Sequence, residues 1–168
     1  MKDAKYFLYG VLGIFVAIWF YNVLAEERIK VNAFKQALAL NKDKGIVNFG
    51  ATGSGIVWMT KEIARNPKVV VNVDIRADST PNFVYCDLGQ FPYPFADKQF
   101  DVAFCSHILE HLDNWRAALD EWRRVADHII VVLPIPYLHG WFAPAHKQHF
   151  GDKEIEEMRK LPNVFVYC

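Results

Sequence analysis

Four short apolar segments constrain the fold of this chain more than any other feature of its sequence. Each is rich in β-branched or aromatic residues and ends at or beside a small or acidic residue; they span 46–49, 69–73, 83–86 and 101–106. Segments of this kind are typical of strands that are buried on both faces of a parallel sheet. They predict an α/β fold, namely a Rossmann-like, doubly wound, mostly parallel sheet in a three-layer αβα arrangement.

The segments between and after these strands carry helical and further strand patterns. A short helical turn is expected at 108–112, and Asp113 is expected to act as the N-cap of the helix that follows. The remaining predicted elements are helices at 56–65, 114–126 and 152–160 and strands at 129–133 and 164–167.

Residues suited to ligand binding gather where the strands are expected to end. Gly50-Ala-Thr-Gly-Ser-Gly55 joins a strand to a helix, where glycines allow a sharp turn and the helix N-terminus offers free N–H groups. Asp74 ends the second strand about 20 residues later, where a carboxylate can accept both hydroxyl hydrogens of a ribose. Asp87 ends the third strand, where it could meet an adenine amino group. For both aspartates a turn or a helix cap is the alternative.

The N-terminal segment from Tyr6 to Ala25 contains no charged residue. A helix over this length covers about 30 Å, the thickness of the hydrocarbon core of a bilayer. We therefore expect residues 1–25 to form a transmembrane anchor and residues 26–168 to form an α/β domain that begins with an amphipathic helix over 26–40. A cleaved signal peptide ending near Ala25 and a buried core helix are the alternatives.

The distribution of basic residues predicts which side of the membrane the domain occupies. Lys2 and Lys5 precede the apolar segment, whereas a larger number of basic residues follow it: Arg28, Lys30, Lys35, Lys42 and Lys44. The positive-inside rule then predicts a single-pass membrane protein whose α/β domain lies in the cytoplasm.

Composition narrows the range of partners. Nineteen basic and nineteen acidic residues cancel, so no nucleic-acid partner is expected. Cys86, Cys105 and Cys168 lack metal-ligand spacing, and the first two fall within predicted strands, where a free cysteine acts as a small apolar residue. These cysteines fit a reducing compartment, and no metal site is expected.

Two motifs point to other enzyme classes. His107-Ile-Leu-Glu-His111 fits the His-x-x-Glu-His arrangement of a zinc protease, but it follows a predicted buried strand. Gly-Ala-Thr-Gly also occurs in short-chain NAD(P) reductases, whose Tyr-x-x-x-Lys spacing this chain lacks. Both readings are therefore less favoured than the one that follows.

The segment at 91–112, Phe-Pro-Tyr-Pro-Phe-Ala-Asp-Lys-Gln-Phe-Asp-Val-Ala-Phe-Cys-Ser-His-Ile-Leu-Glu-His-Leu, resembles the strand-four region of one enzyme family. That family is the class I S-adenosylmethionine-dependent methyltransferases of the type 11 group. Together with the glycine loop, Asp74 and Asp87, the resemblance covers about residues 45–135. The later His146-Lys-Gln-His149-Phe150 resembles a His-x-x-His-Phe segment seen after strand five in some members.

The resemblance implies S-adenosyl-L-methionine as the cofactor and a set of contacts at the strand ends. Asn48 occupies the position where the family usually carries an acidic residue, which helps to hold the amino group of the cofactor. The other implied contacts are Gly50, Ala51 and Gly53 near the methionine part, Asp74 and Ile75 at the ribose, Asp87 and Leu88 at the adenine, and Ser106 and His107 beside the sulfonium.

The implied reaction is methyl transfer from the sulfonium to an O, N or C nucleophile. The protein mainly has to align donor and acceptor, and a base is required only if the acceptor is protonated. The candidates for such a base are His107, His111 and His149. The anchor favours a small-molecule or lipid-like acceptor associated with the membrane. Asn48 and the Gly-x-x-Gly-x-Gly spacing favour the alternative, a membrane-tethered, catalytically inactive methyltransferase-like binding domain.

Overall fold

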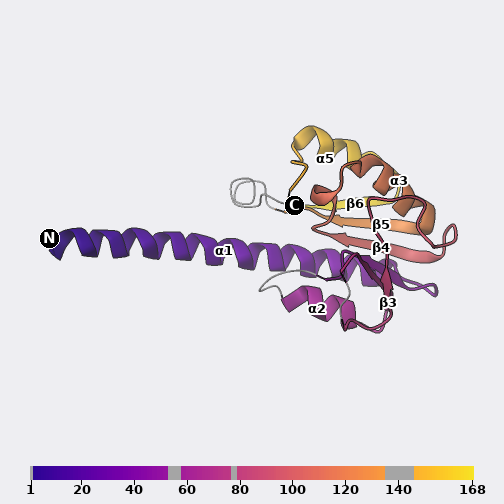
Figure 1. The fold of residues 1–168 in the computed structure, drawn as a ribbon, viewed down its shortest axis with the longest axis horizontal. Helices are drawn as coiled ribbons and strands as arrows, with labels where there is room; N and C mark the ends of the chain where they lie inside the picture. Colours follow the sequence, from indigo (N-terminus) through magenta and orange to yellow (C-terminus); the bar gives the residue numbers. More distant parts are fainter. Residues whose placement is uncertain (1, 53–57, 77–78, 135–145) are drawn as a thin grey trace.

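The computed structural model describes residues 2–52, 58–76, 79–134 and 146–168 of the chain. These residues form a six-stranded parallel sheet with helices on both faces and one long helix that extends away from the domain (Figure 1). The predicted Rossmann-like α/β fold is therefore confirmed.

All neighbouring strands of the sheet run parallel, in the order β3-β2-β1-β4-β5-β6. The order reverses beside β1, because β2 and β3 are added on one side of it and the later strands on the other. The strands are β1 (Ile46–Phe49), β2 (Val69–Asp74), β3 (Phe83–Tyr85), β4 (Phe100–Ser106), β5 (Ala126–Val132) and β6 (Val164–Tyr167).

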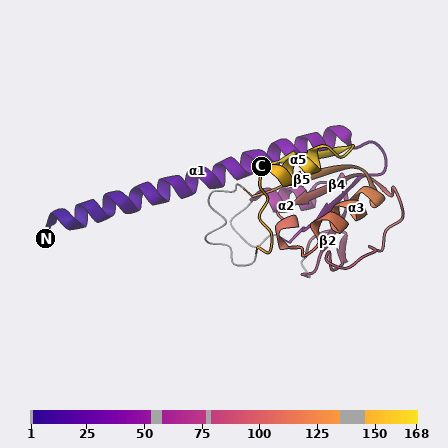
Figure 2. The same ribbon diagram turned by 90° about the horizontal axis from the view of Figure 1, so that it is seen from above.

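Alternate side chains of the strands enter two separate cores, one on each face of the sheet. The first core lies beneath α3 (Trp115–Val125) and α5 (Asp152–Arg159), where Phe49 stacks on Trp122 with ring centroids 5.8 Å apart. The second lies beneath α1 and α2 (Trp58–Arg65). Seen from above, α1 and α3 flank the sheet on opposite sides (Figure 2).

α1 is a single helix from Lys2 to Leu40. Its C-terminal part packs Ala33, Phe34 and Ala37 into the second core, and Phe34 meets Phe104 of β4 edge-to-face with ring centroids 5.4 Å apart. The expected helix at 26–40 is thus present but continuous with the segment before it. Residues 14–40 contain neither glycine nor proline, so nothing in the chain interrupts the helix at residue 25.

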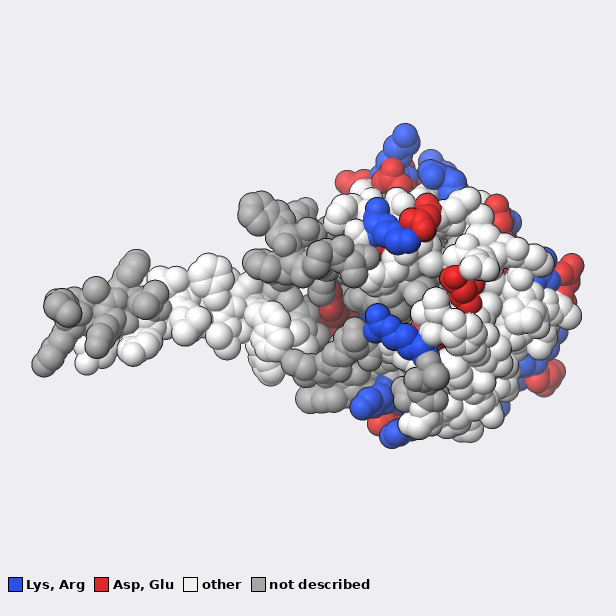
Figure 3. All heavy atoms as spheres, in the orientation of Figure 1, with Lys and Arg blue, Asp and Glu red and all other residues white. Residues whose placement is uncertain are grey.

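The N-terminal part of α1 stands clear of the domain. By length and composition, Tyr9–Leu40 qualifies as a candidate membrane span, and none of its most apolar 18-residue window is buried. In Figure 3 the described part of this projection is free of the charged side chains that cover the domain. Its exposed large apolar residues are Tyr6, Tyr9, Leu12, Ile14, Phe15, Val16, Ile18, Trp19, Phe20, Tyr21 and Leu24.

Several local predictions need correction. Asn114, not Asp113, is the N-cap of α3, since its Oδ1 accepts a hydrogen bond of 3.1 Å from the Ala117 N–H. Asp113 instead forms an ion pair of 2.6 Å with Lys147. β5 begins at Ala126, immediately after α3, because pairing with β4 extends to Phe100. Cys86 follows β3 rather than lying within it.

Replacing Phe34 with alanine should destabilise the domain by about 3 kcal/mol, because the substitution leaves a cavity beside Phe104. The Phe34 side chain is only 6% exposed. The measurement is chemical unfolding of the full chain in detergent micelles, followed by tryptophan fluorescence.

The matched control for this prediction is Phe20→Ala on the projecting half of the same helix. Phe20 is 56% exposed, so its loss should change the stability of the domain by less than about 0.5 kcal/mol. Equal effects of the two substitutions would contradict the division of α1 into a packed half and a free half.

Candidate functional site

The carboxyl ends of β1 and β4 form the point at which the strand order of the sheet reverses. The chain leaves β1 toward α2 on one face and leaves β4 toward α3 on the other, as the two cores show. Open α/β sheets bind their ligands outside the carboxyl ends of the strands at such a reversal, so this edge of the sheet is the candidate site.

The turn after β1 is fixed by β2. The N–H groups of Gly50 and Ala51 both donate to the Val73 carbonyl oxygen, at 2.9 and 3.2 Å. Gly50 has a φ of +76°, a conformation that glycine adopts without the strain of a side chain. The structure therefore bends the chain sharply at Gly50, as the glycine pattern predicts. Gly53 lies outside the described residues.

Asp74 links the glycine loop to the end of β2. One carboxylate oxygen accepts from the Thr52 N–H at 2.9 Å and the other from the Arg76 N–H at 3.0 Å. A carboxylate offers about four acceptor positions, so capacity for ligand hydroxyls remains. The neighbouring Ile75 is 50% exposed, so an apolar side chain lies open beside this carboxylate.

Asp87 and Leu88 lie next along the same edge. The Cys86 N–H donates to the Asp74 carbonyl oxygen at 3.1 Å, which brings this segment to the end of β2. Asp87 accepts from the Gly89 N–H at 2.9 Å and from the side chain of Gln90 at 3.1 Å, the arrangement of a turn-forming aspartate. Leu88 is buried.

Asn48 is buried and bound within the domain. Its side-chain amide donates to the Asn72 Oδ1 at 2.8 Å, and Asn72 in turn donates to the carbonyl oxygens of Ala64 and Pro81, each at 2.8 Å. The pair therefore couples β1 to β2 and to the connections around β2. The expected contact between Asn48 and a cofactor amino group stays a prediction.

The end of β4 turns sharply into a short 3₁₀ helix, η1 (Leu109–His111). His107 has a φ of +53°, and its N–H donates to the Val132 carbonyl oxygen of β5 at 2.9 Å. This conformation, which is rare for a residue with a side chain, lets the chain leave the sheet directly after Ser106. The His107 Nδ1 lies 3.8 Å from the Glu110 Oε1.

Glu110 is a buried carboxyl that was not among the residues expected at the site. It is 1% exposed, and neither carboxylate oxygen has a hydrogen-bond partner among the described residues. Burial raises the pKa of Glu110 to about 7; the charge of Lys30 on α1 opposes this rise in pKa, and that of Glu26 adds to it. Because these partners lie about 80 residues away in the sequence, no local pattern could have revealed this contact.

Two histidines lie beside this carboxyl: His111, which was an expected candidate for the base, and His146, which was not. The ring of His111 meets that of His146, with centroids 4.9 Å apart, whereas His149 is exposed. The N–H groups of Lys147 and Gln148 donate to the Glu110 carbonyl oxygen at 2.7 and 3.0 Å, which fixes this segment against η1.

The same cluster offers ligands for a metal ion. Donor atoms of Glu110, His111 and His146 lie within 4.8 Å of one another, a set of ligands that suits a divalent transition metal. Lys30 already supplies positive charge to Glu110, so the carboxyl has a counter-charge without an ion.

The strand ends fit a ligand that carries hydroxyl and amino groups. The Thr52 hydroxyl is buried next to the glycine loop and has no hydrogen-bond partner among the described residues. Asp74 retains acceptor capacity beside it, and Ile75 offers apolar surface. The ribose of an adenosine group would present its hydroxyls to Thr52 and Asp74 and the apolar face of its sugar ring to Ile75.

Comparison with known proteins gives one finding about family. Residues 51–128 match the family model described as a methyltransferase domain. The match spans the region from the glycine loop through β2, β3 and β4 to the start of β5. It confirms the resemblance to the class I S-adenosylmethionine-dependent methyltransferases of the type 11 group. No curated protein and no solved structure matches the chain.

The raised pKa of Glu110 predicts a pH-dependent stability. The folded state keeps a proton that an unfolded glutamic acid, with a pKa of 4.5, has already lost, so stability should fall as the pH rises from about 4.5 through 7. Relative to Glu110→Gln, the free energy of unfolding of the wild type should fall by up to about 3 kcal/mol over this range.

The measurement is chemical unfolding in detergent micelles at a series of pH values. The groups near Glu110 are Lys30 and Glu26 from α1, His107 from the end of β4, and His111 and His146. All of them are present in both the wild type and the variant, so the difference between the two pH profiles reports the Glu110 carboxyl and its interactions with these groups. Glu156→Gln on the surface of α5 serves as the control, and parallel pH profiles for the wild type and Glu110→Gln would contradict the prediction.

Proposed function

We propose that this chain, whose residues 51–128 match the family model of a methyltransferase domain, transfers a methyl group from S-adenosyl-L-methionine to an acceptor at the carboxyl edge of its sheet. The single observation that carries the proposal is the tight loop after β1, in which Gly50 and Ala51 donate to the Val73 carbonyl oxygen and Thr52 donates to the Asp74 carboxylate. The matched segment begins within this loop, at Ala51. Members of this family generally use S-adenosylmethionine.

Binding of the donor is assigned to the residues at the ends of four strands. Gly50 and Ala51 would face the methionine part, with Asp74 on the ribose hydroxyls and Ile75 against the sugar. Asp87 and Leu88 would lie at the adenine, while Ser106 and His107 would lie beside the sulfonium. Gly53 and Asn48 belong to the same proposed set, although Asn48 already has a partner in Asn72.

The donor supplies an activated methyl group on a sulfonium that leaves as a neutral thioether. The chain's own residues would align the acceptor and, where the acceptor is protonated, remove its proton. His107 is the first candidate for this base because the carboxyl of Glu110 lies 3.8 Å from its Nδ1 and can stabilise the imidazolium. His111 is next to it along η1, and His149 is the more distant candidate.

The domain is proposed to be held at a membrane by the N-terminal half of α1, with residues 1–25 as the anchor and the α/β domain in the cytoplasm. The length and composition of α1 support the anchor. The excess of basic residues after the apolar segment supports the cytoplasmic side.

A binding domain without catalysis is the second candidate, and one observation favours it. Asn48 stands where the family usually has an acidic residue, and its amide is committed to Asn72. Such a domain would bind the donor or its demethylated product but would transfer no methyl group.

The donor-binding proposal is tested by calorimetry with S-adenosylmethionine and its demethylated product. Asp74→Asn removes the charge and the acceptor for the N–H of the exposed residue Arg76, while its remaining side-chain oxygen can still accept from the Thr52 N–H. The loop should therefore stay in place, and the dissociation constant should rise at least about tenfold. Asp120→Asn, at an exposed position on α3, should change the dissociation constant less than twofold. Failure of the wild type to bind either compound would refute the proposed function, and equal affinities for wild type and Asp74→Asn would refute the ribose contact.

The orientation is tested with the exposed thiol of Cys168. A membrane-impermeant maleimide should label Cys168 at least about tenfold faster in inside-out vesicles than in sealed right-side-out vesicles, because the domain lies on the cytoplasmic side. Cys168→Ser controls for labelling of the half-buried Cys86. Faster labelling in right-side-out vesicles would place the domain on the other side of the membrane.

A further inference from the structure

The direction of α1 relative to the strands is fixed by contacts at its two ends. Just beyond its C-terminus, the N–H groups of Lys42 and Lys44 donate to Asp101, near the start of β4, at 2.8 and 2.9 Å. Thirteen residues before the end of the helix, Glu27 accepts from the Met59 N–H, near the start of α2, at 3.3 Å. α1 therefore runs antiparallel to the strands, and Glu27 lies at their carboxyl edge.

The electrostatic partners of Glu110 lead to the same placement. Glu110 follows the end of β4, and its pKa responds to the charges of Lys30 and Glu26 on α1. Residues 26–30 of the helix thus lie beside the candidate site, at the opposite edge of the sheet from Asp101.

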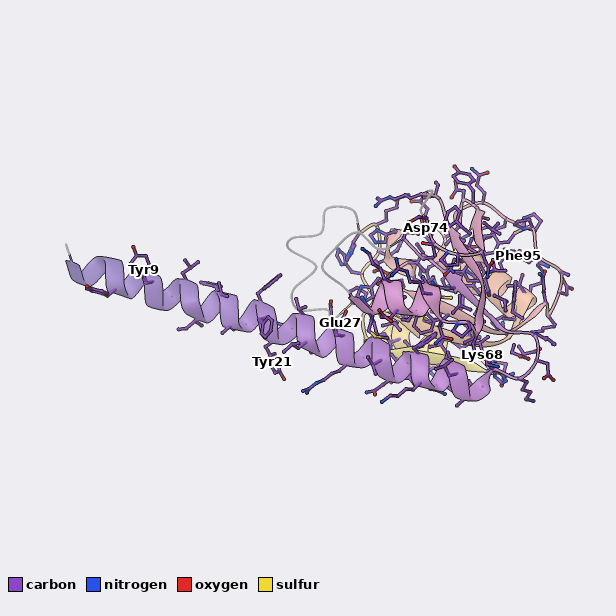
Figure 4. The ribbon with its side chains drawn as sticks, turned by 90° about the horizontal axis from the view of Figure 1, so that it is seen from below. Tyr9, Tyr21, Glu27, Lys68, Asp74 and Phe95 are labelled. Atoms are coloured by element: carbon purple, nitrogen blue, oxygen red, sulfur yellow. The ribbon has the colours of Figure 1, made fainter. Side chains whose placement is uncertain are left out.

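The projecting half of α1 consequently leaves the domain through the edge that carries the site. Figure 4 shows Tyr9 and Tyr21 on the projection and Glu27 where the helix meets the domain. In the same view Asp74, at the end of β2, lies farther along the axis of α1 toward its N-terminus than Lys68, which precedes that strand.

The axial distance between the apolar segment and the site is short. From Leu24, the last exposed large apolar residue of the projection, to Glu27 the helix rises about 4.5 Å. The headgroup region of a bilayer leaflet is about 5–8 Å thick. A helix embedded up to Leu24 would therefore hold the strand ends at the level of the headgroups.

The side chains exposed at that edge suit a membrane surface. Tyr85, the last residue of β3, is 66% exposed and pairs with Asp74, the last residue of β2. Ile75, directly after Asp74, is 50% exposed. The exposed cation of Arg76 follows directly. An apolar residue, a tyrosine and a cation together are typical of segments that contact the interface between lipid and water.

We propose that the carboxyl edge of the sheet faces the bilayer surface and that the methyl acceptor is a nucleophile on the headgroup of a lipid in the same leaflet. The proposal rests on the proposed methyl transfer. The acceptor lone pair forms a bond to the methyl carbon, the carbon–sulfur bond breaks with its electrons going to sulfur, and any acceptor proton passes to His107 or to water.

The orientation is tested by fluorescence quenching in vesicles of phosphatidylcholine and phosphatidylglycerol that contain a headgroup-nitroxide lipid. The full chain carries one fluorophore, at Tyr85→Cys or at Lys68→Cys, in a Cys86→Ser, Cys168→Ser background. Quenching should be at least threefold stronger at position 85 than at position 68, which lies at the opposite edge of the sheet. Equal or stronger quenching at position 68 would overturn the orientation, whether or not the donor binds.

The acceptor class is tested with native membranes that carry the full chain and with tritiated-methyl S-adenosylmethionine. Label should enter the chloroform-soluble fraction, and Asp74→Asn should reduce it at least tenfold. Label that enters only the aqueous or protein fraction would overturn the lipid acceptor but leave methyl transfer intact. With the donor bound, label in no fraction would overturn both proposals.

A spacer variant separates the position of the site from its chemistry. Inserting eleven alanine-rich residues between Ala25 and Glu26 adds three helical turns and lifts the domain about 16 Å from the membrane, with little change in helical phase. Lipid labelling should fall at least tenfold while the dissociation constant for S-adenosylmethionine changes less than twofold. Undiminished lipid labelling would contradict a site held at the headgroups.

Discussion

The packing of α1 on the sheet is the contact on which the rest of the structure depends. Ala33, Phe34 and Ala37 cover a face formed by β1, β4 and β5, which would otherwise present a continuous apolar surface to solvent. A cut after Ala25, as in a cleaved signal peptide, would leave this packing in place. The fold therefore requires the helix only from about Glu26 onward. The described residues before Glu26 do not contribute to either core, so they can serve as the proposed membrane anchor.

The candidate site depends on a second constraint, the burial of β1 between β2 and β4. The end of β2 holds the loop after β1, through the Val73 carbonyl oxygen and the Asp74 carboxylate. Asp74 thus shapes the loop and also faces the proposed ligand, so the architecture and the binding chemistry share one residue. The hydrogen bond between the side chains of Asn48 and Asn72 also links β1 to β2, within the strands rather than at their ends.

Much of the fold could be predicted because its strands and helices follow from local patterns of apolar residues in the sequence. The predicted strand at 164–167 matches β6 at both ends, and the first strand begins at Ile46 as predicted, since buried runs of β-branched and aromatic residues are bounded by turn residues. The N-cap of α3 was harder to predict, because Asp113 and Asn114 are both favourable N-cap residues and only the backbone conformation decides between them. The site was predictable where it follows strand ends, as at Asp74. It was not predictable at Glu110, whose environment is made by Lys30 and Glu26 on a distant helix.

The uninterrupted course of α1 has a kinetic consequence under the proposed membrane anchorage. Because α1 contains no glycine or proline between residues 14 and 40, it has no hinge about which the domain could rotate relative to its anchor. Such an enzyme would search for its acceptor by lateral diffusion in two dimensions. Its turnover would then follow the mole fraction of acceptor in the leaflet rather than the bulk concentration, and dilution of the membrane with inert lipid would slow it even at constant total acceptor.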